Sequence, residues 1–292
     1  MKQLLVIANP VSGRGRSLKK AESFMASASD SGILCTLVYR RGETAMLEEV
    51  ETLLATDEFS GVIVVGGDGL LHTLLPTLKQ NRLPFTIIPA GTGNDFAREI
   101  KAMKRSAGEL LDQIKSAPHF VDTFLVNGEI SENIGIQVLS LGFDALVNER
   151  ANKMKVIKGK SKYVVAMIRE LPIFKPMRFD LEIDGTSIER EAMLIAIANG
   201  SSYGGGMRIC PDADHGDGEL DILILNKVSI VELIKVFPKV YFGKHISHPA
   251  VEILRGRNLR VNAPAKAFAD GEFISELPVS ISVAPASLQV WR

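Results

Sequence analysis

Short apolar runs alternate with helical periodicity over residues 1–122. The runs are typical of buried strands and lie at Leu4–Ala8, Leu34–Val38, Val62–Val65 and Thr86–Ile88. Between and after them, apolar residues recur three or four positions apart, which predicts helices over Ser17–Ala28, Thr44–Ala55, Leu70–Lys79 and Ser106–Lys115. This alternation predicts a three-layer α/β domain with a parallel sheet, whose functional crevice lies at the carboxyl ends of the strands.

From residue 123 onward the pattern becomes strand-rich. Apolar or alternating runs predict strands at Phe179–Ile183, Met193–Ala198, Leu220–Leu225, Val251–Leu254, Leu259–Val261 and Val279–Val283. Asp184-Gly185 is a turn signal, and one helical stretch covers about Ser229–Tyr241. We therefore predict an α/β domain over 1–122 and an antiparallel β-rich domain over 123–283, with the tail 284–292 returning to the first.

The composition narrows the possible classes of protein. Lys plus Arg and Asp plus Glu both number 34, so the formal net charge is zero and no global signal for nucleic-acid binding exists. The two cysteines, Cys35 and Cys210, form no CxxC motif, which suits a reducing cytoplasm. The apolar run near the N-terminus is too short for a signal peptide, and no window reaches the roughly 20 apolar residues of a membrane span. We expect a cytoplasmic protein whose membrane contact, if any, is peripheral.

Three glycine-containing loops follow predicted strands of the first domain. They are Asn9–Ser17, Gly66–Gly69 and Pro89–Arg98. Glycines let backbone N–H groups approach phosphate oxygens, and the following helix N-terminus favours negative charge. The alternative is that Gly and Asn only shape tight turns. Three such loops in one half of the chain favour a phosphate-binding site, to which Arg14, Arg16 and Arg98 could add charge-assisted bonds.

The familiar phosphate motifs are absent. The chain contains no GxxxxGK, so it is not a P-loop protein, and its three partial GxGxxG matches each lack the last glycine. It also contains no HRD or DFG motif, which excludes the protein-kinase plan.

Five motifs run in order from Asn9 to Glu272: Asn9-Pro10-x-Ser12-Gly13, Gly66-Gly67-Asp68-Gly69, Pro89-x-Gly91-Thr92-x-Asn94-Asp95-Phe96-Ala97-Arg98, Ser140-x-Gly142-Phe143-Asp144 and Asp270-Gly271-Glu272. This set resembles the diacylglycerol kinase catalytic-domain family, which includes bacterial diacylglycerol kinases and, more distantly, sphingosine and ceramide kinases. GGDG alone is shared with NAD kinases and phosphofructokinases, but the full set is specific.

The resemblance implies two domains with ATP in the cleft between them and a lipid hydroxyl that attacks the γ-phosphate in the presence of Mg²⁺. It implies nucleotide contacts at Asn9, Pro10, Ser12, Gly13, Gly66, Gly67, Asp68, Gly69, Leu70 and Thr92. It places Asp68, Asp95 and Asp122 in an acidic network around Mg²⁺, and Glu272 as the base that accepts the hydroxyl proton. From spacing alone, Asp95 and Asp122 could instead be helix or turn caps, and Glu272 could be a solvated turn residue.

One departure from the family pattern follows the GGDG motif. The family usually continues with Thr and then x-Asn-Glu, whereas this chain has Leu70-Leu71-His72-Thr73. Loss of the hydroxyl removes a phosphate or helix-cap contact, which puts nucleotide affinity and activity in question. His72 could also be a packing or surface residue without a chemical role.

A dense acidic segment covers residues 211–221. It favours either a hard-cation site or a solvated turn, and its spacing is not that of an EF-hand. Some bacterial members of the resembled family carry a structural Mg²⁺ here, bound by one Asp side chain and main-chain carbonyls. The matching positions are Asp214, Asp217 and Glu219.

The segment Arg150–Arg178 is strongly basic. It contains nine Lys or Arg residues against Glu170 alone, a net charge of +8 in a neutral chain. Lys158 and Lys162 share one face with further basic residues if the stretch is helical, and apolar residues lie among them. This pattern favours contact with an anionic membrane surface, although an ordinary solvated face would look similar.

These observations predict an ATP- and Mg²⁺-dependent kinase of diacylglycerol or a related lipid alcohol, acting at the inner membrane face. The runner-up enzyme is a kinase of a soluble alcohol such as NAD. The rival from another class is a catalytically silent nucleotide- or lipid-binding relative. We expect no nucleic-acid partner and leave a homodimer open.

Overall fold

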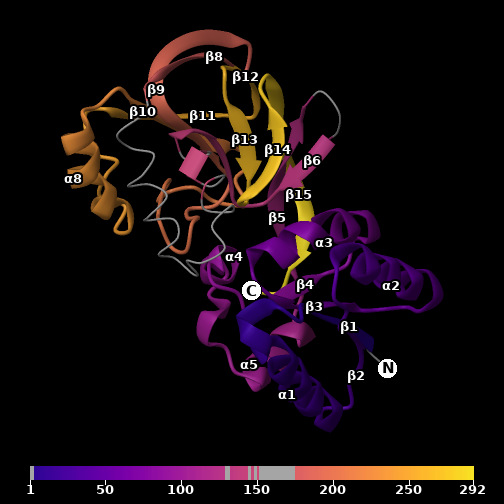
Figure 1. Cartoon of the computed structure of the whole chain (residues 1–292). Coiled ribbons are helices and arrows are strands. Elements are labelled where there is room, and N and C mark those ends of the chain that lie inside the picture. The colour runs from indigo at the N-terminus through magenta and orange to yellow at the C-terminus, as the bar shows by residue number, and fades with distance from the viewer. Residues whose placement is uncertain (1–2, 129–131, 144–145, 148–149, 151–174) are drawn as a thin grey trace. The chain divides into compact units, whose positions relative to one another are not determined.

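The computed structural model describes residues 3–128, 132–143, 146–147, 150 and 175–292 (Figure 1). It forms two compact units. Unit 1 comprises residues 1–121 and 286–292, and unit 2 comprises residues 122–285. Within the described ranges, no helix is both long enough and apolar enough to cross a membrane.

Unit 1 is built on a parallel sheet. Its strands β1 (Gln3–Ala8), β2 (Leu34–Val38), β3 (Gly61–Gly66) and β4 (Phe85–Pro89) are arranged in the order β2-β1-β3-β4, and the end of β15 (Val279–Val290) pairs in parallel with β4. The helices are α1 (Arg16–Asp30), α2 (Glu43–Thr56), α3 (Asp68–Asn81), α4 (Asp95–Glu99) and α5 (Ala107–Lys115), with short 3-10 turns at Ser12–Gly15 and Ala102–Lys104. The predicted strands and helices of this unit are confirmed. The short α4 was not predicted and begins inside the expected loop 89–98.

Local sequence explains where these elements begin. Every residue of β3 is buried, as its continuous apolar run predicts for a central parallel strand. The helix expected from Ser106 begins one residue later, because Ser106 is its N-cap. The Ser106 hydroxyl accepts a hydrogen bond from Glu109 N, and the Glu109 carboxylate accepts one from Ser106 N, which completes a capping box.

Trp291 fills a space that Gly61 leaves open in unit 1. Its backbone N–H donates to Phe85 O at 2.9 Å, and its side chain is buried in the same cluster as Leu4, Phe24 and Leu110. A Cβ atom on Gly61 would lie 2.2 Å from the indole ring and 2.5 Å from Pro84 O. The absent side chain at Gly61 is therefore a packing requirement.

Unit 2 is antiparallel and β-rich. Its strands are β5 (His119–Asn127, which starts in unit 1), β6 (Glu132–Gly135), β7 (Val138–Gly142), β8 (Met177–Ile183), β9 (Thr186–Ala198), β10 (Leu220–Asn226), β11 (Val251–Gly256), β12 (Asn258–Asn262), β13 (Lys266–Ala269), β14 (Glu272–Glu276) and the first part of β15, with the helix α8 (Ile230–Val240) after β10. The first half of β9 pairs with β8, and its second half lies between β7 and β10. The predicted strands and helix are confirmed, whereas the strand β5 and the short strands β6, β7, β13 and β14 were not predicted.

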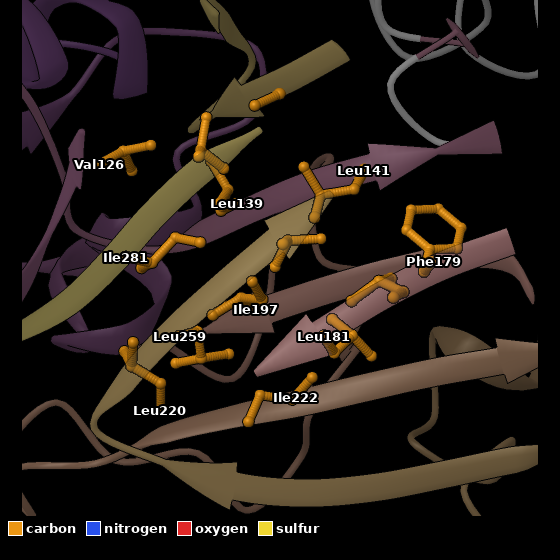
Figure 2. Packing of buried hydrophobic residues seen from close by; sticks show 14 of the residues in the cluster. Val126, Leu139, Leu141, Phe179, Leu181, Ile197, Leu220, Ile222, Leu259 and Ile281 are labelled. Atoms are coloured by element: carbon orange, nitrogen blue, oxygen red, sulfur yellow. The ribbon is translucent and has the colours of Figure 1, made fainter. Parts of the chain in front are cut away.

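Two apolar clusters cover opposite faces of the central strands of unit 2. Leu139, Leu141 and Ile197 face the cluster that Figure 2 shows. Their neighbours Val138 and Ala198 face a second cluster that includes α8 residues. Because side chains alternate along a strand, a strand buried on both faces is apolar without interruption, as the predicted run Met193–Ala198 is.

The turn between β8 and β9 confirms the Asp184-Gly185 signal. Asp184 and Gly185 have φ values of 47° and 84° and connect Ile183 directly to Thr186. Two successive residues with positive φ form the tight turn that matches the twist of a hairpin.

We predict that Gly61→Ala destabilises the protein by about 1–3 kcal/mol, because the new methyl group overlaps the Trp291 ring and the Pro84 carbonyl. The free energy of unfolding from urea denaturation measures the effect. Gly108→Ala is the matched control, since a Cβ there meets nothing within 4 Å and α5 gains a better helix former. Equal stability of the two variants would contradict the packing argument.

Candidate active site

Backbone contacts bring the loops after β3 and β4 together in unit 1. Ala90 N and Gly91 N both donate to Gly66 O, at 2.7 and 3.1 Å. A Cβ atom on Gly91 would lie 2.5 Å from the Cα atom of Gly67, and a Cβ atom on Gly67 would lie 2.9 Å from the Cα atom of Gly91. Glycine is thus required at both positions, because the two backbones touch.

The loop after β1 reaches the same edge of the sheet. Gly13 has a φ of 59°, and a Cβ atom there would lie 2.7 Å from Ala90 O. Asn9 holds the loop, because its side-chain oxygen accepts from Val11 N at 3.0 Å and its carbonyl accepts from the Ser17 hydroxyl at 2.6 Å. The Lys20 ammonium donates to Pro89 O, and burial followed by the nearby Arg16 charge lowers its pKa.

Two carboxylates converge on Gly93 in the loop after β4. A Cβ atom on Gly93 would lie 2.7 Å from Asp68 Oδ2 and 3.4 Å from Asp95 Oδ2. Asp68 is the first residue of α3, and its Oδ1 accepts from Phe96 N at 3.2 Å. The predicted pair Asp68 and Asp95 therefore lies on two neighbouring loops that meet at one place.

Asn94 and Arg98 hold the loop that carries Asp95. The Asn94 side chain bridges the Gly91 backbone, accepting from Gly91 N at 3.0 Å and donating to Gly91 O at 2.9 Å. Its φ of 54° turns the chain into α4. The Arg98 guanidinium pairs with Asp95 at 2.9 Å and donates to Asn94 O at 3.2 Å. Sequence reasoning considered Arg98 as a phosphate contact, and the structure shows it paired with the buried Asp95.

The predicted nucleotide residues fall on these three loops. Asn9, Pro10, Ser12 and Gly13 follow β1; Gly66, Gly67, Asp68, Gly69 and Leu70 end β3 and begin α3; Thr92 follows β4 and is exposed. Leu70 differs from the others because its side chain is buried, and it packs where a Cβ atom on Gly66 would lie, 2.6 Å from Leu70 Cδ2. The Leu70 side chain therefore packs against Gly66 at the start of the glycine turn.

Unit 2 holds Asp122 in a buried polar network. Its Oδ2 accepts from Gly218 N at 2.8 Å, its N–H donates to His215 O at 2.6 Å, and its carbonyl accepts from Asn199 Nδ2 at 2.9 Å. The His215 ring is hydrogen-bonded to the Gln137 side chain at 2.5 Å, and Gln137 also donates to Ser202 O at 3.0 Å. The backbone position of Asp122 is therefore fixed by groups that are far apart in the sequence.

Asp270 fixes the turn that presents Glu272. The Asp270 carboxylate accepts three successive backbone hydrogen bonds, from Ile136 N at 2.9 Å, Gln137 N at 2.8 Å and Val138 N at 3.1 Å. Asp270 and Gly271 have φ values of 53° and 93° and join β13 to β14. Glu272 is the first residue of β14 and is exposed, so its backbone is held while its carboxylate faces solvent.

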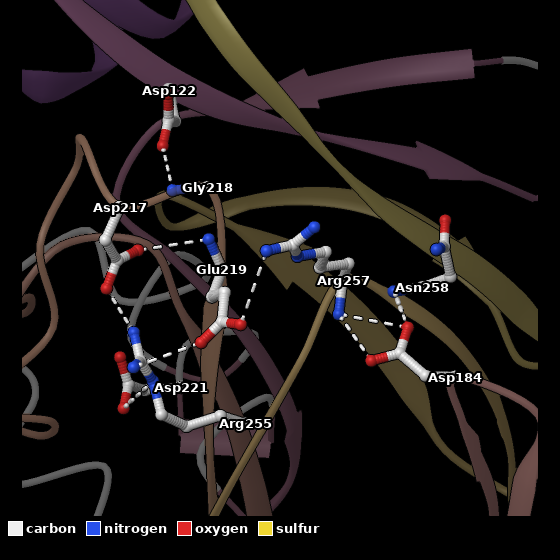
Figure 3. A network of polar contacts seen from close by, with 9 residues as sticks. All are labelled: Asp122, Asp184, Asp217, Gly218, Glu219, Asp221, Arg255, Arg257 and Asn258. Carbon is white, nitrogen blue, oxygen red and sulfur yellow. Dashed lines mark hydrogen bonds and ion pairs between the residues drawn. The ribbon is translucent and has the colours of Figure 1, made fainter.

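The acidic segment 211–221 finds arginine partners across strands (Figure 3). The pairing of β10 with β11 places Asp221 opposite Arg255, whose guanidinium contacts Asp217, Glu219 at 3.0 Å and Asp221 at 3.5 Å. Glu219 also lies 3.7 Å from Arg257. Burial raises the pKa of Asp221, and Arg255 acts in the opposite direction.

The side chains of Asp214, Asp217 and Glu219, where we expected a cation, have other partners in the structure. Asp217 and Glu219 pair with Arg255, and Asp214 Oδ1 accepts from Gly216 N at 3.0 Å within its own turn. Among the residues that the structure describes, no group of three or more His, Cys, Asp or Glu side chains could hold a metal ion. A metal held there through main-chain carbonyls stays a prediction. The predicted membrane residues Lys158 and Lys162 lie outside the described residues.

Comparison with known proteins matches each half of the chain to a family of domains. Residues 3–126 match the diacylglycerol kinase catalytic domain, and residues 137–292 match the YegS C-terminal NAD kinase beta sandwich-like domain. The class defined is thus a two-domain kinase with a parallel α/β domain and a β-sandwich-like domain.

Relatives match over the full length. A diacylglycerol kinase of Mycobacterium tuberculosis is 36% identical over 99% of this chain and 95% of its own, and a Bacillus subtilis diacylglycerol kinase is 28% identical over 95% and 92%. A crystal structure of a putative diacylglycerol kinase from Bacillus anthracis superposes with a TM-score of 0.77 at 20% identity, covering 99% of this chain and 97% of that one. The chain belongs to the diacylglycerol kinase family.

We predict that Asp270→Asn lowers the free energy of unfolding by about 1–3 kcal/mol, because the amide nitrogen cannot accept and leaves backbone N–H groups without their acceptor. Urea denaturation checks it. Asp180→Asn is the control in the same unit, since that exposed carboxylate has a surface pair with Arg178 that contributes little. Equal losses in the two variants would show that the Asp270 contacts do not stabilise the turn.

Proposed function

We propose that this protein transfers the γ-phosphoryl group of ATP to the hydroxyl of diacylglycerol or a related lipid alcohol. The observation that carries the proposal is the meeting of three glycine loops and the carboxylates of Asp68 and Asp95 at one edge of the parallel sheet. Phosphoryl transfer depends on positioning and on neutralising charge, and this arrangement supplies both. The full-length relatives named diacylglycerol kinase support the lipid substrate.

The glycine loops suit the phosphates of ATP. Gly13, Gly67 and Gly91 let the three loops pack backbone against backbone at one edge of the sheet, and α3 begins at Asp68, directly after the glycine turn. Backbone N–H groups and a helix N-terminus bind phosphate oxygens in this way. Nucleotide contacts by Asn9, Ser12 and Thr92 are part of the proposal.

The residues present also suit Mg²⁺. This ion prefers oxygen ligands and is held by one or two carboxylates together with phosphate oxygens and water. Asp68 and Asp95, which both flank Gly93, would hold it, and we include Asp122 in the acidic network as a further proposal. When bound, Mg²⁺ would neutralise charge on the phosphate oxygens.

We assign the general base to Glu272. As the lipid hydroxyl oxygen forms a bond to the γ-phosphorus, the bond to ADP breaks, and Glu272 takes the hydroxyl proton. The exposed carboxylate on a backbone held by Asp270 supports this role, because a base must meet the substrate in a fixed orientation.

A second candidate is a silent relative that binds nucleotide or lipid without turnover. It is favoured by Leu70, which stands where the family usually has a threonine and whose side chain is buried. The two candidates differ in turnover.

The deciding experiment is a screen for ATP consumption with diacylglycerol, monoacylglycerol, ceramide, sphingosine and undecaprenol in mixed micelles, and with NAD in solution. Turnover of a lipid alcohol supports the proposal. Turnover of NAD alone would replace it with a soluble-alcohol kinase. ATP binding without any turnover would support the silent relative.

We predict that Asp68→Asn lowers kcat by roughly 10²-fold or more, comparable to the loss of one preorganised electrostatic contact. The asparagine oxygen can still accept from Phe96 N, so the loop keeps its geometry and only the charge is lost. Initial rates over a range of Mg²⁺ concentrations measure the effect, and the surface variant Asp30→Asn is the control. An unchanged rate and unchanged Mg²⁺ dependence would remove Asp68 from the metal site.

We predict that Glu272→Gln lowers kcat by roughly 10²–10⁴-fold, the usual contribution of a general base, with KM values for ATP and lipid nearly unchanged. Glu276→Gln is the matched control, because Glu276 is also exposed on β14. A variant that keeps its kcat and raises only the lipid KM would make Glu272 a substrate-positioning residue.

A further inference from the structure

Helix α8, labelled in Figure 1, belongs to unit 2. Its apolar side chains form two stripes on opposite sides of the helix. The inner stripe consists of Leu233, Val236 and Val240, which are buried. Leu233 and Val240 belong to the same cluster as Leu223 and Leu225 of β10. Residues three and four apart lie on one face of a helix, so this stripe accounts for the attachment of α8 to its unit.

The other stripe faces outward. Val231 and Ile234 are 61% and 56% exposed, and Phe242, directly after the helix, is 71% exposed. Together with the half-exposed Tyr241 they form what we call the outer stripe. At 100° per residue, Val231 and Ile234 lie on the side of the helix away from Val236 and Val240. Large apolar side chains gathered on one face usually mark an interaction surface.

Positive charge borders the outer stripe. Residues 227–248 contain Lys227, Lys235, Lys239 and Lys244 against Glu232 alone, a net charge of +3 in a chain with no net charge. Lys235 and Lys239 lie next to the outer stripe in the helical projection. The Glu232 carboxylate is held in the capping box at the start of α8, where it accepts from Ser229 N at 3.0 Å and from the Ser229 hydroxyl at 2.8 Å.

We propose that the outer stripe of α8 docks on the surface of an anionic lipid bilayer. A helix that lies in the membrane interface presents apolar side chains to the acyl boundary and lysines to anionic headgroups, which is the combination found here. The outer stripe consists of described residues, none of which belongs to the basic segment Arg150–Arg178 of the sequence. The choice of a lipid surface rests on the proposed function, so binding is tested without ATP and without turnover.

A tryptophan probe tests the orientation directly. Trp291 is the only tryptophan of the chain and is buried, so Phe242→Trp adds one exposed indole. With vesicles of phosphatidylglycerol and phosphatidylcholine, the emission should shift to shorter wavelength and be quenched by brominated acyl chains. Leu34→Trp, at an exposed position on β2 in unit 1, should show neither effect. Equal quenching of both probes, or of neither, would overturn the proposal.

Two sets of substitutions separate the apolar and ionic contributions. Combined Val231→Ser, Ile234→Ser and Phe242→Ser should weaken vesicle binding at least roughly tenfold on the basis of lost apolar burial. Combined Lys235→Glu and Lys239→Glu should weaken it by more than roughly 25-fold, since each lysine near an anionic surface contributes about fivefold. The ionic loss should vanish on pure phosphatidylcholine and shrink at high salt. Leu34→Ser and Lys115→Glu are the matched controls and should bind normally.

The remaining outcomes are also decisive. Thermal unfolding must be unchanged in both sets, as expected for exposed positions; if the serine set unfolds, the lysine set and the Phe242→Trp probe still test the proposal. Equal vesicle binding by all variants would overturn it. Light scattering that shows a dimer of the parent and a monomer of the serine variant, with equal vesicle binding, would assign the outer stripe to a second copy. Vesicle binding through α8 by a protein without lipid turnover would leave the docking surface in place and reject the proposed function.

Discussion

The close approach of two glycine backbones is the constraint on which the site of unit 1 depends. Gly67 and Gly91 are so near that a Cβ atom on either would overlap the other. This contact lets Gly66 O accept from both Ala90 N and Gly91 N, so the ends of β3 and β4 are joined beyond their last ladder bonds. Asp68 then reaches Phe96 N, and its second carboxylate oxygen lies beside Gly93 and Asp95. Two carboxylates repel one another, and the Arg98 guanidinium, 2.9 Å from Asp95, offsets part of that repulsion.

In unit 2, carboxylates hold two of the turns. Asp270 accepts three backbone N–H groups, and Asp184 accepts those of Arg257 and Asn258. Hydrogen bonds from these backbone groups lower the pKa of Asp184. Buried or half-buried N–H groups need an acceptor, and one carboxylate can serve several of them. A turn held in this way can leave the next side chain in solvent without losing its orientation, as at Glu272.

Local patterns predicted the elements because each depends on neighbours in the sequence. Four strands and four helices of unit 1 and the Asp184-Gly185 turn follow from periodicity and turn chemistry. The short α4 was not predictable in the same way, since its five residues follow Asn94, whose left-handed φ is stabilised by hydrogen bonds between its side chain and the Gly91 backbone. The motifs placed Asp68 and Asp95 on separate loops, and only the folded sheet edge brings them to Gly93. The contacts of Asp270, and the link from Gln137 to His215, join segments more than 70 residues apart and leave no local signal.

The acidic segment shows why charge density alone is weak grounds for a metal site. Asp217, Glu219 and Asp221 carry three formal negative charges, and Arg255 with Arg257 supplies two positive ones. Strand pairing decides this, because β11 places Arg255 opposite Asp221, and that partner is 34 positions away in the sequence. Asp221 is buried and therefore depends most on its ion pair with Arg255, because a buried charge without a partner costs far more free energy than a solvated one. The Arg255 guanidinium has several N–H donors and can pair with carboxylates from three directions, as a metal ion would. Unlike a metal ion, it offers no coordination position at which a ligand could exchange. The acidic residues of this segment therefore stabilise the pairing of β10 with β11 through their contacts with Arg255. Any metal bound there has to be held mainly by main-chain carbonyls.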